Sequence, residues 1–213
     1  MAWDLLEENF NDLTDWADGD TSDGVSQISP AGYLDQAVGA SAGQAKIEQD
    51  IGTIGTGDFT FEFKIKPILL PDVQNWLQIK GATSHIALEM LSDGFQVHDG
   101  AQYNKTSYAW DTGTYYTIRC IVHNSQTDMD VYIDGTKEAT DVDCSLASSQ
   151  DGFVMFSMND ANCHWSVDYL YIGAGQQVPS ATSIKKVSGV AYASIKKIAG
   201  VAIGSVKKIG GVE

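Results

Sequence analysis

Strict alternation of apolar and polar residues between Phe59 and Pro67 is the feature that most limits how this chain can fold. The segment is "FTFEFKIKP", and every second residue from Phe59 to Ile65 is large and apolar. Successive side chains of a β-strand point to opposite faces, so the pattern places Phe and Ile on one face and Thr, Glu and Lys on the other. The segment therefore predicts a strand with one face in a hydrophobic core.

Further short strands are indicated as far as about Gly173. Gly, Ser and Asp separate them, and "NSQTD" and the pair Asp134-Gly135 are turn signals. The strand segments are "NWLQIKG", "HIALEML", "GFQVHDG", "TYYTIRCIVH", "MDVYIDGTKEA", "DGFVMFSMN" and "HWSVDYLYIG". No stretch of ten or more residues in this region has a clean helical period, and the less regular first 55 residues suit an edge strand, a loop and a closing strand. The sequence predicts an all-β antiparallel sandwich or barrel.

The C-terminal residues 183–213 consist of an eleven-residue repeat that starts at Ser183, Ser194 and Ser205. We therefore divide the chain into a body (1–174), a linker (175–182) and the repeats. Eleven residues correspond to three helical turns, whereas a Gly at position 7 of every repeat and many β-branched residues favour short strands; both structures remain open.

Each repeat has an apolar stripe that one unit cannot bury alone, so it must stack on its neighbours, on the body or on another chain. The stripe residues are Ile184, Val187, Val190, Ile195, Ile198, Val201, Val206 and Ile209.

Charge is spread unevenly along the chain. The formal net charge is −15, with −20 in residues 1–182 and +5 in residues 183–213, which hold six lysines. A body this acidic repels nucleic acid and anionic membrane surfaces. Its only arginine, Arg119, argues against an anionic polysaccharide as ligand, because such groups are usually bound by arginine.

The cysteines and the N-terminal segment bear on the compartment. Cys120, Cys144 and Cys163 could form at most one disulfide, and we expect buried or free thiols. The segment "MAWDLLEENF" has no basic and apolar regions of a secretory signal, and no apolar run has the length of a membrane span. We expect synthesis in a cytoplasm and a final place on a virion or outside the cell, reached by lysis, within a particle or by unusual export.

Four segments in order resemble concanavalin A-like and laminin-G-like jelly rolls over about residues 6–173. They are "ENFNDLTDW", "GDFTFEFKIKP", "YYTIRCIVHNSQTDMDVYIDGTKEA" and "HWSVDYLYIG". The resemblance implies an antiparallel jelly-roll β-sandwich with a short repeat appendage. It does not specify function, since the fold carries lectin-like modules, glycan lyases, glycanases and structural units.

The tandem "SIKKI-x-GVA" repeats resemble endings appended to phage and prophage virion proteins. The three lysine pairs, Lys185-Lys186, Lys196-Lys197 and Lys207-Lys208, match that pattern in register. This resemblance implies a role in assembly or attachment, with virion proteins or another copy of the chain as partner.

A structural calcium ion is implied by the jelly-roll resemblance, because in similar domains calcium joins the first strand to the last. Glu8 and Asn9 lie on the opening segment and Asp168 on the closing strand, so these three are the candidate ligands. A second acidic cluster, "DGDTSDG" with Asp18, Asp20 and Asp23, lacks a complete calcium-loop pattern, and a solvated loop is the preferred interpretation.

Catalytic signatures of this fold are missing from the sequence. The glycanase pattern Glu-x-Asp-x-x-Glu and the lyase pattern Arg-x-Glu-x-Arg do not occur, and "LQIKG" has Lys80 where a lyase has histidine. The four histidines are scattered singly. A non-catalytic protein is favoured, with a lyase or glycanase of atypical site as the alternative.

Binding of a neutral glycan is predicted for a region rich in aromatic residues, "HDGAQYNKTSYAWDTGTYY", which we expect to be mostly loop. The candidate ligand-binding residues are Tyr103, Asn104, Tyr108, Trp110, Asp111 and Tyr115. The alternative is that Trp110 and one tyrosine pack over the rim of the sandwich. The combined hypothesis is a jelly roll displayed on a virus particle for glycan or surface binding, with a decoration protein without ligand as a further alternative.

Overall fold

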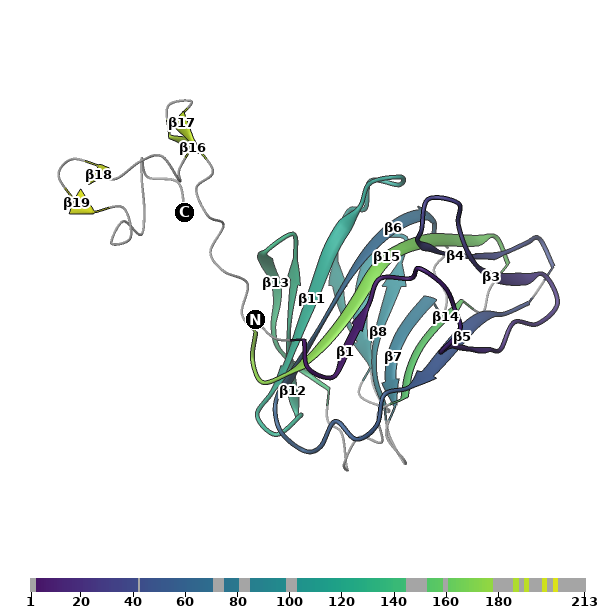
Figure 1. Cartoon of the computed structure of the whole chain (residues 1–213), viewed down its shortest axis with the longest axis horizontal. Coiled ribbons are helices and arrows are strands. Elements are labelled where there is room, and N and C mark those ends of the chain that lie inside the picture. Colours follow the sequence, from purple (N-terminus) through teal and green to yellow (C-terminus); the bar gives the residue numbers. More distant parts are fainter. Residues whose placement is uncertain are drawn as a thin grey trace. The chain divides into compact units, whose positions relative to one another are not determined.

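The computed structural model describes most of the body and four residue pairs of the repeats. The described residues are 3–41, 43–70, 75–80, 85–98, 103–144, 153–158, 161–177, 186–187, 190–191, 197–198 and 201–202. Their regular structure is entirely β-strand (Figure 1), and none of them belongs to a helix that could span a membrane. The chain forms two compact units, Met1–Val178 and Pro179–Glu213. The division between them falls inside the predicted linker.

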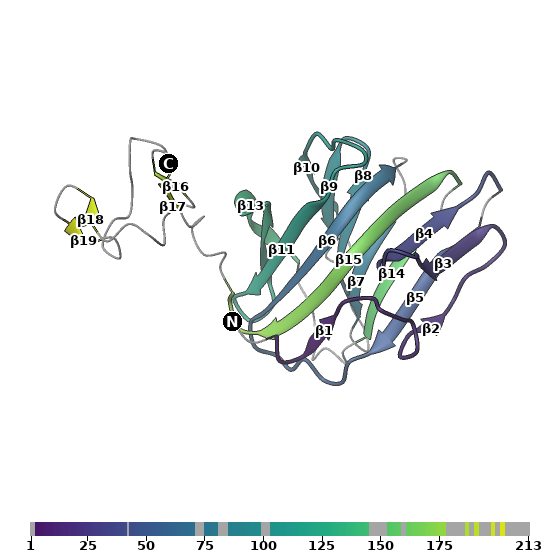
Figure 2. The same cartoon turned by 45° about the horizontal axis from the view of Figure 1, so that its top comes forward.

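Two antiparallel sheets face each other in the body (Figure 2). Sheet I has the order β13-β12-β11-β6-β15-β4-β3, and β1 also pairs with β15. Its strands are β1 (Leu6–Glu8), β3 (Gly24–Ile28), β4 (Leu34–Val38), β6 (Phe59–Leu69), β11 (Tyr116–His123), β12 (Asp128–Ile133), β13 (Thr136–Asp143) and β15 (Cys163–Ala174).

Sheet II has the order β10-β9-β8-β7-β14-β5-β2. Its strands are β2 (Ala17–Asp18), β5 (Ala45–Asp50), β7 (Asn75–Lys80), β8 (His85–Leu91), β9 (Gly94–His98), β10 (Tyr103–Ser107) and β14 (Phe153–Met158). The prediction of an all-β antiparallel jelly-roll sandwich is therefore confirmed.

Alternate residues of the central strands fill the space between the sheets. The four apolar residues of the opening pattern, Phe59 to Ile65, are at most 1% exposed, as their alternation predicted. Trp165 of β15 is equally buried, and its indole Nε1 donates a hydrogen bond to Gln36 Oε1 at 2.8 Å. Because Gln36 is fully buried, this bond satisfies a polar group inside an apolar core.

The acidic loop around Asp20 is bound to the sandwich by hydrogen bonds. Asp20 Oδ2 accepts from Ser26 N at 2.5 Å, and Asp20 Oδ1 accepts from Ser26 Oγ at 2.8 Å and Lys46 N at 2.7 Å. Asp18 and Asp23 likewise accept from the backbone amides of Asp20 and Ser41. The carboxylates thus satisfy backbone donors between β2 and β5, a role that the sequence did not indicate.

The N-terminal 55 residues form five strands, more than the edge strand, loop and closing strand that we expected. Three of these strands, β3, β4 and β5, have five or six residues each, and the inward positions of β4 include the polar residue Gln36. β3 lies at the end of the strand order of sheet I, where β4 is its one neighbour among the described strands.

A buried ion pair lies on the outer face of sheet I. Arg119 Nε and Nη2 approach Glu62 Oε2 at 2.6 and 2.5 Å, and Glu62 is only 7% exposed. Tyr169 donates its hydroxyl to the other Glu62 oxygen at 3.0 Å, and Arg119 Nη1 donates to Gln177 O at 3.0 Å. The only arginine in the sequence therefore binds groups of the fold itself.

The three cysteines are free and buried, as expected. Burial raises the pKa of the Cys120 thiol, with Cys144 nearby as a second cause. A thiol kept protonated and shielded from solvent is unreactive, so we assign Cys120 a packing role.

In the second unit, two short antiparallel pairs recur at the repeat period. β16 (Lys186–Val187) pairs with β17 (Val190–Ala191), and β18 (Lys197–Ile198) pairs with β19 (Val201–Ala202). The two pairs occupy the same positions of the first and second repeats, which favours strands over a helix there. Four of the predicted stripe residues lie outside the described residues: Ile184, Ile195, Val206 and Ile209.

Candidate functional site

An aromatic cluster forms where the chain passes from β10 to β11. The ring centroids of Tyr108 and Trp110 are 4.5 Å apart, and Tyr116 lies 5.0 Å from Trp110 and 6.0 Å from Tyr108. Tyr116 is buried, whereas Tyr108 and Trp110 are half-buried and pack against the core from the rim. Two residues predicted to bind a ligand are thus brought together, and they also pack over the rim, as the alternative proposed.

Trp110 is oriented by a hydrogen bond to the β8–β9 turn. Its indole Nε1 donates to Gly94 O at 3.0 Å. A Cβ atom at Gly94 would lie 2.1 Å from Thr106 O, so only glycine allows β10 to pass this close. The turn and the residues after β10 are therefore held against each other.

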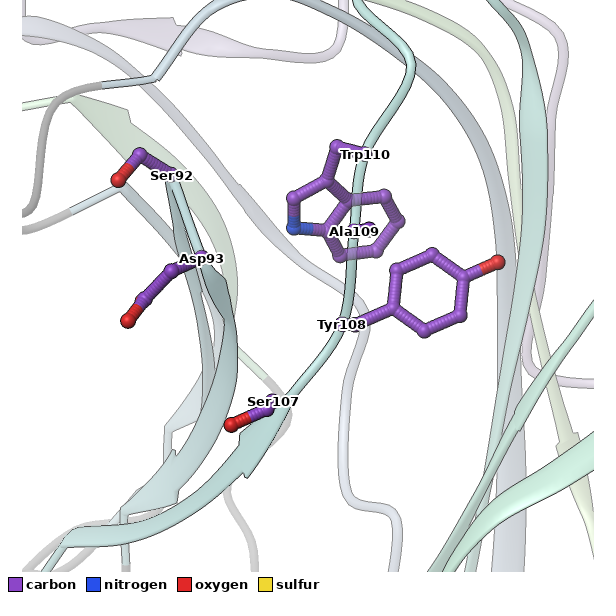
Figure 3. Close-up of a pocket in the computed structure, with 6 residues that line it drawn as sticks. All are labelled: Ser92, Asp93, Ser107, Tyr108, Ala109 and Trp110. Atoms are coloured by element: carbon purple, nitrogen blue, oxygen red, sulfur yellow. The ribbon is translucent and has the colours of Figure 1, made fainter.

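The residues between this turn and Trp110 line an open pocket, which we call the rim pocket (Figure 3). Its volume is 440 Å³, within the range of about 300–1,000 Å³ that small-ligand sites have. It is lined by Ser92, Asp93, Ser107, Tyr108, Ala109 and Trp110. Figure 3 shows Ser92 and Asp93 on one side and the Trp110 ring opposite, with its nitrogen toward them and the Tyr108 hydroxyl pointing away.

The polar side chains of the rim pocket include a hydrogen-bond acceptor and groups that both donate and accept hydrogen bonds. Asp93 is bound by Lys105, whose Nζ lies 2.7 Å from Oδ1, and this hydrogen bond lowers the pKa of the Asp93 carboxyl. The carboxylate is therefore an ionised acceptor of hydrogen bonds. Burial raises the pKa of Tyr108, but its hydroxyl points away from Ser92 and Asp93. Two serine hydroxyls add groups that both donate and accept.

Sequence reasoning missed Ser92, Asp93 and Ser107. The signal available was "LSDGF", a tight-turn pattern between two strands. It indicated a turn, but the approach of this turn to the residues after β10 depends on strand pairing distant in the sequence.

The other predicted ligand-binding residues are not at the rim pocket. Tyr103 and Asn104 belong to β10, an edge strand that we had expected to be loop, and Asn104 Nδ2 donates to Asp143 O at 3.1 Å. The backbone N–H of Asp111 donates a hydrogen bond to Tyr116 Oη at 2.7 Å. Tyr115 lies on the outer face of sheet I, where Lys64 and Lys66 approach its ring at 4.9 and 5.0 Å.

The predicted calcium ligands have protein partners in the structure. Glu8 accepts hydrogen bonds from Phe10 N at 2.5 Å and Trp16 Nε1 at 3.1 Å. Asn9 Oδ1 accepts from the Tyr171 hydroxyl at 2.8 Å, and Asp168 forms an ion pair with Lys64 at 2.6 Å. A calcium ion at Glu8, Asn9 and Asp168 stays a prediction, and these contacts give each of the three a structural role without it.

A cluster of nearly buried polar and aromatic side chains lies on the outer face of sheet II. Trp76 and Gln78 of β7, Glu89 of β8 and His98 of β9 are 3–9% exposed, although alternation turns them away from the core. Trp76 and His98 pack edge to face at 5.6 Å, and Gln96 donates a hydrogen bond to Glu89.

The described carboxylates on this outer face lie far apart across sheet II. Among the described residues, the other carboxylates that sheet II turns outward are Glu48 and Asp50 on β5. β5 and β8 are separated by β14 and β7, which at about 4.8 Å per strand places Glu89 about 14 Å away. The two-carboxylate mechanism of most glycosidases uses about 5–9.5 Å between the carboxyl groups.

Comparison with known proteins shows the fold. No family profile and no curated protein sequence matches the chain. Among solved structures, it resembles a Bacillus licheniformis β-glucanase (14% identity, TM-score 0.58, 80% of this chain and 98% of that one). It also resembles carbohydrate binding module CBM66 from Bacillus subtilis (13%, 0.52, 76% and 96%).

A sialidase is similar as well, with 12% identity and a TM-score of 0.59 over 76% of this chain. The chain spans only 17% of the length of that sialidase. These similarities establish a concanavalin A-like jelly roll, a class that contains both glycan-binding modules and glucanases. At such low identity they show the fold alone.

Proposed function

We propose that the protein is a non-catalytic carbohydrate-binding module whose rim pocket binds a neutral glycan. The observation that carries the proposal is the pairing of a half-buried Trp110 with Asp93 and two serine hydroxyls around one open pocket. Sugars present apolar C–H faces and rings of hydroxyl groups, so a site for them needs an aromatic surface beside hydrogen-bonding side chains.

Charge supports a neutral ligand. Asp93 is the one charged side chain among the lining residues of the rim pocket, and its partner Lys105 is engaged by it. The body carries a formal charge of −20 over residues 1–182, which disfavours carboxylated or sulfated glycans. The distance between the outward carboxylates of sheet II supports binding over hydrolysis.

The test is Trp110→Ala, assayed on a panel of neutral polysaccharides such as β-glucan, xylan and mannan by affinity electrophoresis and calorimetry. Loss of the ring is expected to weaken binding about ten-fold or more, a free energy of about 1.4 kcal/mol. Trp3→Ala is the matched control, since Trp3 is also half-buried but packs against Tyr171 on sheet I, with the ring centroids 5.6 Å apart. Asp93→Asn, at an exposed position, keeps the test valid if Trp110→Ala loses stability.

Two results would contradict the proposal. One is that wild type binds no glycan of the panel, and the other is that Trp110→Ala and Asp93→Asn both bind as tightly as wild type. Release of new reducing ends or unsaturated uronates from any polysaccharide would instead support the alternative of an enzyme with an atypical site. Alginate and polygalacturonate serve as anionic references, and preferential binding to them would contradict the assignment of a neutral ligand.

For the second unit we propose a docking role on a virion or similar extracellular assembly. The supporting observation is that equivalent strand pairs recur in two repeats, so that Val190 and Val201 occupy equal positions. The unit would attach the glycan-binding body to particle proteins or to further copies of the chain.

Replacing Val190 and Val201 by Asp in the full chain is expected to abolish cosedimentation with purified particles, because a charge in the stripe cannot be buried. Lys186→Gln with Lys197→Gln is the matched control, which removes two charges and keeps the stripe. Loss of cosedimentation in the lysine variant alone would show that charge, and not the apolar stripe, attaches the protein.

A further inference from the structure

Three side chains with metal-binding atoms meet on the outer face of sheet I. His123 ends β11, Asp130 lies in β12 and Asp141 lies in β13, and these strands are adjacent. His123 Nε2 is 3.7 Å from Asp130 Oδ1 and 3.5 Å from Asp141 Oδ1. Within the described part of the chain, no other group of three His, Cys, Asp or Glu residues brings ligand atoms together in this way.

The imidazole of His123 is the observation that points to a ligand. His123 is 8% exposed, and its Nε2 is buried without a hydrogen-bond partner. The two carboxylate oxygens are beyond the usual hydrogen-bond length of about 2.7–3.2 Å. Buried polar atoms in proteins are nearly always satisfied. We therefore expect one further atom that His123 Nε2 and the two carboxylate oxygens contact together.

A β-bulge directs the Asp141 carboxylate toward this point. Met129 pairs with Val142 and Val131 with Ala139, so Asp130 faces two residues of β13, one of which is Asp141. Asp141 has a φ of 49°, a left-handed conformation that is uncommon for a residue other than glycine. Bulges re-aim side chains, and this one brings Asp141 beside the end of β11.

Asp130 is held in place by contacts that leave it able to bind a cation. Lys137 Nζ donates to Oδ2 at 2.5 Å, and Asp141 N donates to Oδ1 at 3.1 Å. A carboxylate oxygen has two lone pairs, so Oδ1 retains one for the shared point. Fixing a ligand through its second oxygen is how outer contacts orient metal-binding carboxylates.

We propose that His123, Asp130 and Asp141 bind a divalent transition-metal ion, with zinc as the reference case. Bonds of about 2.0–2.1 Å in a tetrahedral site separate the ligand atoms by about 3.4 Å, close to the 3.5 and 3.7 Å found. An imidazole nitrogen selects zinc and its neighbours over calcium and magnesium, which prefer oxygen alone. Asp141 is 66% exposed, so water can complete the coordination.

Such an ion joins β11, β12 and β13 at the edge of sheet I. Because the ligands come together only in the folded chain, the ion stabilises the native state by mass action. This site is separate from the rim pocket and from the predicted calcium ligands, so its test is independent of theirs.

The experiment uses the full chain without a polyhistidine tag, freed of metal by a chelator and titrated with zinc by calorimetry. One ion per chain is expected, with a higher melting temperature when zinc is present. Cobalt in place of zinc should give the visible absorption of a low-symmetry nitrogen and oxygen site. Asp141→Asn is expected to weaken zinc binding about ten-fold or more and to abolish the zinc-dependent rise in melting temperature.

Asp143→Asn is the matched control, because it removes the same charge from an exposed position on the same strand. It should bind zinc within about two-fold of wild type. His123→Gln tests whether the imidazole binds zinc. If this substitution of a buried residue unfolds the chain, Asp141→Asn alone decides the test. Equal zinc affinity in wild type and Asp141→Asn, or no zinc binding by wild type, would overturn the proposal.

Discussion

Arg119→Met is expected to destabilise the body by about 3–5 kcal/mol, because it leaves the Glu62 carboxylate buried without its cation. Glu62 is 7% exposed, and its remaining described partner is the Tyr169 hydroxyl at 3.0 Å. The substitution also removes the hydrogen bond to Gln177 O, which fixes the segment after β15. Urea unfolding followed by circular dichroism measures the loss.

Two further variants separate the buried pair from ordinary surface charge. Lys64→Met breaks a pair with Asp168 whose side chains are 35% and 38% exposed, and should cost at most about 1 kcal/mol. Arg119→Met combined with Glu62→Leu should recover much of the stability, since no unpaired charge remains. If Arg119→Met and Lys64→Met cost the same, Glu62 is better solvated than its burial indicates.

Trp165→Ala is expected to cost about 3–5 kcal/mol, the range for removing a large aromatic side chain from a packed core. Trp165 is 1% exposed and packs edge to face on Phe156 at a centroid distance of 6.3 Å. The same urea experiment measures the change, with Val25→Ala, 47% exposed on β3, as a control expected to stay within about 0.5 kcal/mol of wild type.

Trp165→Phe isolates the polar part of this effect. Phenylalanine keeps most of the apolar volume but removes the donor to Gln36 Oε1, which is expected to cost about 1–3 kcal/mol. A loss equal to that of Trp165→Ala would show that the hydrogen bond, and not packing, dominates. A negligible loss would show that Gln36 finds another donor.

Alternation predicted which residues form the core. Phe61 and Ile118 were expected to face inward on their strands, and both are 1% exposed. The Asp134-Gly135 turn signal is also confirmed, since both residues have positive φ and join β12 to β13. These features are local, so a single strand and its turn carry enough information.

Alternation could not predict which side chains on the outer faces of the sheets are buried. Glu62 and Asp130 occupy positions that a half-buried strand leaves in water, yet they are 7% and 9% exposed. Their burial depends on partners such as Arg119 and Lys137, and on the segment near Gln177, whose positions follow from the topology of the whole sheet. The bulge at Asp141 likewise contains no glycine that would have indicated it in the sequence.

The candidate site was predicted in part for the same reason. Trp110 and Tyr108 stood out because aromatic residues are rare in polar loops, but Ser92 and Asp93 are ordinary turn residues. Only the pairing of β9 with β10 brings the two segments together. Tyr115 was grouped with them by closeness in sequence, although it lies on the outer face of sheet I beside Lys64 and Lys66.

The position of β15 has a mechanical consequence. β15 pairs with β6 at ten positions and also with β4 and β1. A force applied at the C-terminal end of β15 and directed along this strand loads these hydrogen bonds in shear, all at once, instead of peeling them one by one. Single-molecule extension that pulls along β15 should therefore need more force than extension that peels the edge strand β13.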